Sequence, residues 1–66
     1  MELNEELQWV FDHRFKSKRV FTDDVKANKI ILRYFPSESY ATCKQYWTCK
    51  TVEDLKALFE KWLDNE

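Results

Sequence analysis

The sequence predicts a two-layer α+β domain, in which two helices cover one face of a small antiparallel sheet. Three observations favour this class. The chain of 66 residues ends in an amphipathic stretch, two β-prone runs flank its single proline, and 17% of its side chains are aromatic. A lone hairpin is unstable in water without a helix to cover it, so we expect both helices to pack on the sheet. The length predicts a single domain over residues 1–66.

The first helix is expected over residues 4–16. Asn4 is a favourable N-cap, and the acidic residues that follow it suit the positive end of a helix. Apolar residues then recur at the spacing of one helical face, namely Leu3, Leu7, Val10, Phe11 and Phe15. At about 100° per residue, Trp9 falls on the opposite side of this stripe and is expected at the surface.

The next segment allows two interpretations. Residues 18–22 are expected to form a short strand, because they contain a β-prone run. Alternatively, Thr22 caps a helical turn that runs through Ala27. With that turn, the order of elements resembles a very small winged helix with residues 37–39 as the wing tip, but two aspartates would then face the DNA with the wrong charge.

A hairpin is expected next, with strands over 29–35 and 40–49. Pro36 ends the first strand because it cannot donate a ladder hydrogen bond. The second run alternates, which places Cys43 and Trp47 on the covered face of the sheet. The open face would show four side chains: Arg33, Tyr40, Lys44 and Tyr46.

The closing helix is expected over residues 52–64. Thr51 and Asp54 approximate a capping box. A broad apolar stripe follows, made of Val52, Leu55, Leu58, Phe59, Trp62 and Leu63. The order of helix, three strands and helix is similar to that of double-stranded RNA-binding domains. Those domains carry a lysine cluster where this chain has Thr51-Val52-Glu53-Asp54, which would repel phosphate, so the chain is assigned to neither family.

Several functional classes are disfavoured by composition. The chain has no glycine, which excludes phosphate-cradling loops and leaves no predicted cofactor. Its net charge of −1 offers no long-range attraction for nucleic acid or lipid. Cys43 and Cys49 would lie on the order of 20 Å apart on one strand, so we expect free thiols, a cytoplasmic location and no membrane association. With only His13 beside them, these cysteines predict no metal site and no catalytic group.

The aromatic content predicts a binding protein, because so small a domain cannot bury every ring. We expect a small non-enzymatic accessory protein that binds another protein, with self-association as a further expectation; its composition resembles that of accessory proteins encoded by phages and mobile elements. The alternative is a nucleic-acid-binding domain that uses the basic cluster 13–19 and the open sheet face. The expected partner-binding residues are Trp9, Arg14, Arg19, Arg33, Tyr40, Lys44 and Tyr46.

Overall fold

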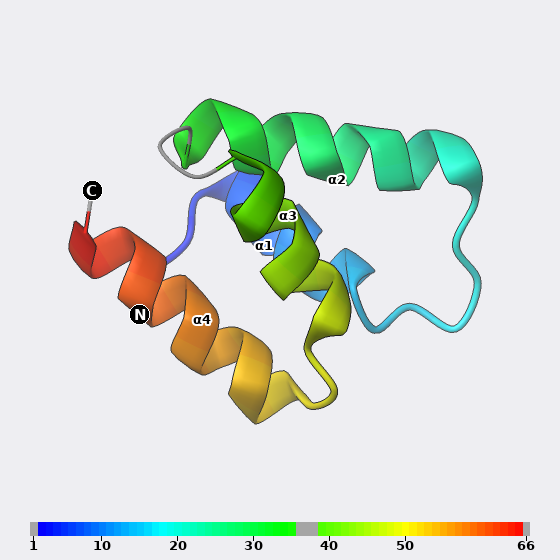
Figure 1. Ribbon diagram of the computed structural model, residues 1–66. Helices are drawn as coiled ribbons and strands as arrows, with labels where there is room; N and C mark the ends of the chain where they lie inside the picture. Colours follow the sequence, from blue (N-terminus) through cyan, green and yellow to red (C-terminus); the bar gives the residue numbers. More distant parts are fainter. Residues whose placement is uncertain (1, 36–38, 66) are drawn as a thin grey trace.

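The computed structural model describes residues 2–35 and 39–65, and these form four helices. Their bounds are Glu5–His13 for α1, Phe21–Tyr34 for α2, Ser39–Thr48 for α3 and Val52–Asn65 for α4. The predicted α+β class is therefore wrong. None of the strands expected over 18–22, 29–35 and 40–49 is present in the described ranges, and the protein is all-α (Figure 1).

The two terminal helices begin where the sequence places them. Asn4 Oδ1 accepts a hydrogen bond of 2.8 Å from Leu7 N at the start of α1. Thr51 Oγ1 accepts one of 3.1 Å from Asp54 N at the start of α4. The first helix was expected to reach residue 16, but it ends at His13, and the residues after it form turns and an extended connection.

The β-prone run over 29–35 belongs to the second half of α2. Ala27, Ile30 and Ile31 are buried, and Tyr34 packs against the same core at the next position of this helical face. A short apolar run fits a buried helix face as well as a strand, and strand propensity depends on the packing environment. The buried positions begin at Ala27, ahead of the β-prone run, and continue at Ile30, Ile31 and the partly buried Tyr34. This spacing of three and four residues is that of a helix.

The alternating segment 40–49 is α3 and the residue that follows it. Its buried residues are Thr42, Tyr46 and Cys49, which recur at i, i+4 and i+7. This spacing puts them on one side of a helix, whereas a strand would place Thr42 and Cys49 on opposite faces. The expected open sheet face therefore does not exist, and Tyr46 lies in the core.

All four helices share one core. Its buried members are Leu7, Val10, Ala27, Ile30, Ile31, Phe35, Tyr46, Cys49, Leu55, Phe59 and Trp62. The ring of Phe59 in α4 meets Phe11 of α1 edge to face, with 5.6 Å between the centroids. In Figure 1, α2 runs across the top, α3 crosses in front of α1, and α4 lies at the lower left. The connection between α1 and α2 extends at the opposite side of the view from α4.

Candidate protein-binding surface

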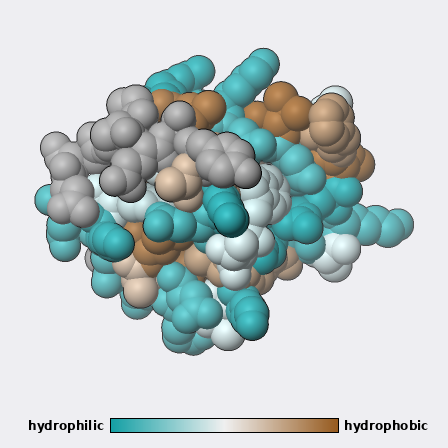
Figure 2. All heavy atoms as spheres, viewed as in Figure 1, coloured by the Kyte–Doolittle hydropathy of each residue, from teal (hydrophilic) through white to brown (hydrophobic). Residues whose placement is uncertain are grey.

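The two most exposed large apolar side chains, Phe21 and Val20, lie where α1 is joined to α2. Phe21, the first residue of α2, is 81% exposed, Val20 before it is 57% exposed, and Phe15 is 37% exposed. We call these three residues the apolar tip. In Figure 2, brown atoms gather at the upper right, over the end of the molecule where α2 begins in Figure 1. Scattered apolar residues are normal on a surface, but Val20 and Phe21 are consecutive exposed residues at the start of a helix, which makes them a candidate contact.

The base of the tip is held by Arg14. Its guanidinium donates hydrogen bonds of 3.0 Å to the carbonyl oxygens of Tyr46 and Trp47, and a third to that of Cys49. These carbonyls lie at or just beyond the C-terminus of α3, where backbone acceptors lack helical partners and positive charge is favourable. Arg14 was predicted to bind a partner, but the structure places it in an internal helix cap.

A second contact joins α1 directly to the first turn of α2. His13 is fully buried, and its Nε2 lies 2.8 Å from Oδ1 of Asp24. The His13 ring stacks on Trp9, with centroids 4.8 Å apart and planes 7° apart, and meets Trp47 edge to face. The Nδ1 atom of His13 has no hydrogen-bond partner among the described residues. The apolar tip thus lies beside two helices that the partly buried contact between His13 and Asp24 joins together.

Two more of the predicted partner-binding residues, Arg19 and Trp9, make contacts within the protein. Arg19 is exposed, yet its guanidinium lies 5.1 Å from the Trp47 ring centroid and donates a hydrogen bond to the carbonyl of Arg14. Trp9 is half-buried, because the His13 ring covers it and the Lys26 ammonium lies 4.4 Å from its ring centroid. Both residues therefore make internal contacts beside the tip.

The remaining predicted site residues do not form a common surface. Tyr46 is fully buried and donates a 2.6 Å hydrogen bond to the carbonyl of Val10, and burial raises the pKa of its phenol. Arg33 pairs with Glu6 of α1 at 2.8 Å. Lys44 is exposed on α3, and the side chain of Tyr40 lies outside the described part of the structure.

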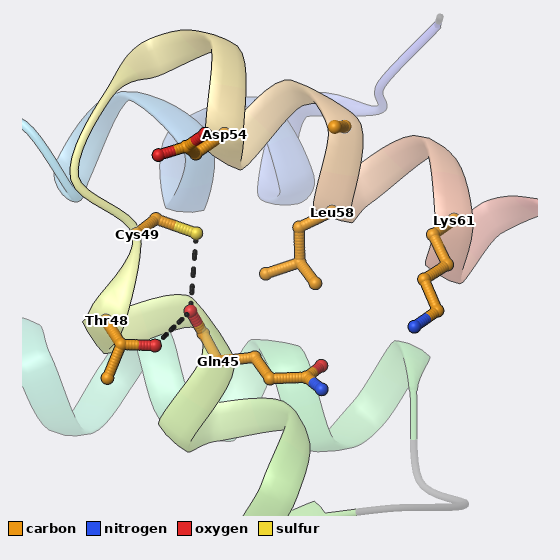
Figure 3. Close-up of a pocket in the computed structure, with 7 residues that line it drawn as sticks. Gln45, Thr48, Cys49, Asp54, Leu58 and Lys61 are labelled. Atoms are coloured by element: carbon orange, nitrogen blue, oxygen red, sulfur yellow. Dashed lines mark hydrogen bonds between the residues drawn. The ribbon is translucent and has the colours of Figure 1, made fainter.

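A shallow groove of about 390 Å³ separates α3 from α4 (Figure 3). Its polar groups are largely engaged: Thr48 Oγ1 and Cys49 Sγ both donate to the carbonyl of Gln45, and the Gln45 side chain accepts from Trp62 Nε1. Burial raises the pKa of the Cys49 thiol, and Asp54 adds to this effect, while Arg14 opposes it. Because a raised pKa keeps the thiol protonated, the groove offers a poor nucleophile.

The sequence interpretation missed the apolar tip because it placed Val20 and Phe21 in a strand. Its one usable signal was the alternative helix near Thr22. On that helix, Phe21 would lie about 120° from Ala27 at 100° per residue, which is away from the buried stripe. The helical alternative therefore predicts an exposed Phe21 ring, whereas the strand does not.

The described residues hold no group of three or more His, Cys, Asp or Glu side chains placed to bind a metal ion. None of the helices, as far as the structure describes them, has the length and apolarity needed to cross a bilayer. Comparison of the chain with protein-family models, curated proteins and solved structures finds no match.

Proposed function

We propose that this chain is a small non-enzymatic accessory protein that acts by binding another protein through the apolar tip. The observation that carries the proposal is the exposure of Phe21, which is 81% accessible at the first position of a helix. Phenylalanine is enriched at protein interfaces, where its ring contributes a large contact area. Full burial of such a side chain contributes about 1.5–3 kcal/mol.

The local helix start supports the same proposal. Val20 is the N-cap of α2 and makes no side-chain capping hydrogen bond, whereas Asn4 and Thr51 cap α1 and α4. Replacing a good N-cap by an apolar residue costs about 1 kcal/mol of stability. Local choices that lower stability are expected at functional sites. The stability lost at Val20 is explained if its side chain is needed for binding.

The scaffold behind the tip also favours a binding role. Arg14 fixes the connection to the end of α3, and the contact between His13 and Asp24 fixes it to α2. A binding loop held by a rigid framework loses less conformational freedom when the partner docks. For the nucleic-acid alternative, the basic cluster is present, but the aromatic sheet face on which bases would stack is not, because the described residues form no sheet.

The proposal is tested by affinity capture from nuclease-treated lysate of the native host, with the wild type, Phe21→Ser and Val52→Ser as baits. Val52 is the matched control, because it is 48% exposed and is the first residue of α4. A protein retained by the wild type and Val52→Ser is expected to bind Phe21→Ser about tenfold to 150-fold more weakly when purified. Equal binding by all three baits would overturn the proposal.

Self-association is a separate part of the proposal, because a domain this small gains stability from burial against a second copy. Light scattering over a range of concentrations is expected to show a mass above 8.1 kDa that falls on dilution. A mass that stays at the monomer value at the highest concentration removes the homodimer and leaves binding to another protein in place.

A further inference from the structure

We propose that the partner surface is acidic, with an apolar pocket that receives Phe21 and a rim of Asp and Glu side chains around it. This inference rests on the proposed function and names the chemistry of the partner. The stretch from Arg14 to Phe21 contains four cationic side chains and no anionic one. The connection that leads to Phe21 is therefore locally basic, although the whole chain has a net charge of −1.

Two of these four cations are free to meet a partner. The guanidinium of Arg14 is engaged by the carbonyls at the end of α3, and that of Arg19 lies over Trp47. Lys16 and Lys18 are exposed and belong to neither of the ion pairs formed among the described side chains. They stand between Phe15 and Val20 in the chain, so we expect them in the polar rim of an interface that has Phe21 at its centre.

Other occupants are opposed by the same charges. A two-fold contact of the tip with a second copy would bring Lys16 and Lys18 of both molecules together, and like charges across an interface are destabilising. Nucleic acid or an anionic bilayer would attract these lysines, but Asp23 and Asp24 follow Phe21 in the first turn of α2, and their negative charge close to the tip disfavours a uniformly anionic surface. A protein can place carboxylates against the lysines and avoid the aspartates.

The first test replaces Phe21 with the photoreactive residue benzoylphenylalanine and irradiates the protein in nuclease-treated lysate of the native host. The peptide attached to residue 21 is then sequenced. We expect a segment of another protein with apolar residues and more Asp and Glu than Lys and Arg. Attachment to a neutral or basic segment, or to a second copy of this chain, overturns the acidic partner but leaves binding through Phe21 intact. Failure of any protein to attach overturns the proposed function as well.

The second test measures the association of the purified partner at increasing NaCl concentrations. Lys16→Gln/Lys18→Gln is expected to lower affinity about twofold to thirtyfold at low salt, mainly through the association rate, and to flatten the salt dependence. Lys50→Gln/Lys56→Gln removes the same charge from exposed sites in the connection after α3 and on α4, and this variant is expected to bind like the wild type. Equal effects of the two double variants on affinity would contradict the acidic rim. A Phe21→Ser variant that binds the partner with wild-type affinity would contradict the docking site itself.

A third arm separates a protein from a lipid source of negative charge. The wild type is sedimented with phosphatidylcholine vesicles that contain or lack phosphatidylserine. We expect no binding to either. Binding that requires phosphatidylserine and is lost in Lys16→Gln/Lys18→Gln would assign the lysines to a membrane surface and overturn the acidic protein partner.

Discussion

Removal of one oxygen atom, in Tyr46→Phe, tests the assignment of this side chain to the core. Tyr46 and Val10 are both fully buried, and the phenol donates a 2.6 Å hydrogen bond to the Val10 carbonyl. The backbone N–H of the C-cap Arg14, which would normally donate to this carbonyl, donates instead to the carbonyl of Asp12. In the variant the ring keeps its edge-to-face contact with Trp47, but the carbonyl is left buried without a donor.

An unsatisfied buried acceptor costs about 1–3 kcal/mol. A chain of this length has a total stability of about 3–10 kcal/mol, so the loss is a large fraction of it. Urea unfolding followed by tryptophan fluorescence measures the difference. Tyr34→Phe is the control, because its hydroxyl donates to Glu6, which is also paired with Arg33 and partly exposed. We expect Tyr34→Phe to lower the free energy of unfolding by about 0.5 kcal/mol. Equal losses for the two variants would refute the buried position of Tyr46.

The same variant predicts a pH dependence. Burial raises the pKa of Tyr46 in the folded protein above its usual value near 10. A raised pKa means that the unfolded chain releases the proton first, so the contribution of Tyr46 is complete below about pH 10 and is lost as the pH rises further. The stability difference between the wild type and Tyr46→Phe is expected to shrink by about 1.4 kcal/mol per pH unit above that point. A constant difference up to pH 11 would contradict the raised pKa.

Three further predictions concern the apolar tip, its support and the thiols. Arg14→Ala is expected to destabilise the protein by about 1.5–3 kcal/mol because it leaves carbonyls of α3 without donors, whereas Arg19→Ala changes stability by less than about 1 kcal/mol; thermal melts measure both. Phe21→Ser is expected to change the free energy of unfolding by no more than about 0.5 kcal/mol, because the Phe21 side chain is exposed. A larger loss of stability would place the ring in the core. Cys43 and Cys49 should react slowly with a thiol reagent near pH 8 and faster in urea, because burial raises the pKa of both thiols; equal rates would refute this.

The candidate site was only partly accessible to sequence reasoning. The abrupt basic run from His13 to Arg19 covers the connection beside the apolar tip, and a charge run of this kind is visible without a fold. The roles within it were not visible. Arg14 caps α3 and His13 is buried against α2, and these contacts join residues that are 11 to 35 positions apart in the sequence, so they leave no local pattern.

By itself, the sequence determined the two terminal helices. Each of them has two local signals, a cap residue (Asn4 or Thr51) and the amphipathic stripe that follows it. Tertiary structure alone decided that the middle of the chain is helical. The segments 29–35 and 40–49 are apolar or aromatic enough for either state, so the state is chosen by which one buries their side chains against α1 and α4. In helices, Ile31 and Tyr46 reach one shared core and Phe21 is left outside it. Burial against distant elements is a property of the folded chain, so only the tertiary structure decided between the strand and the helix at Phe21 and thereby the exposure of its ring.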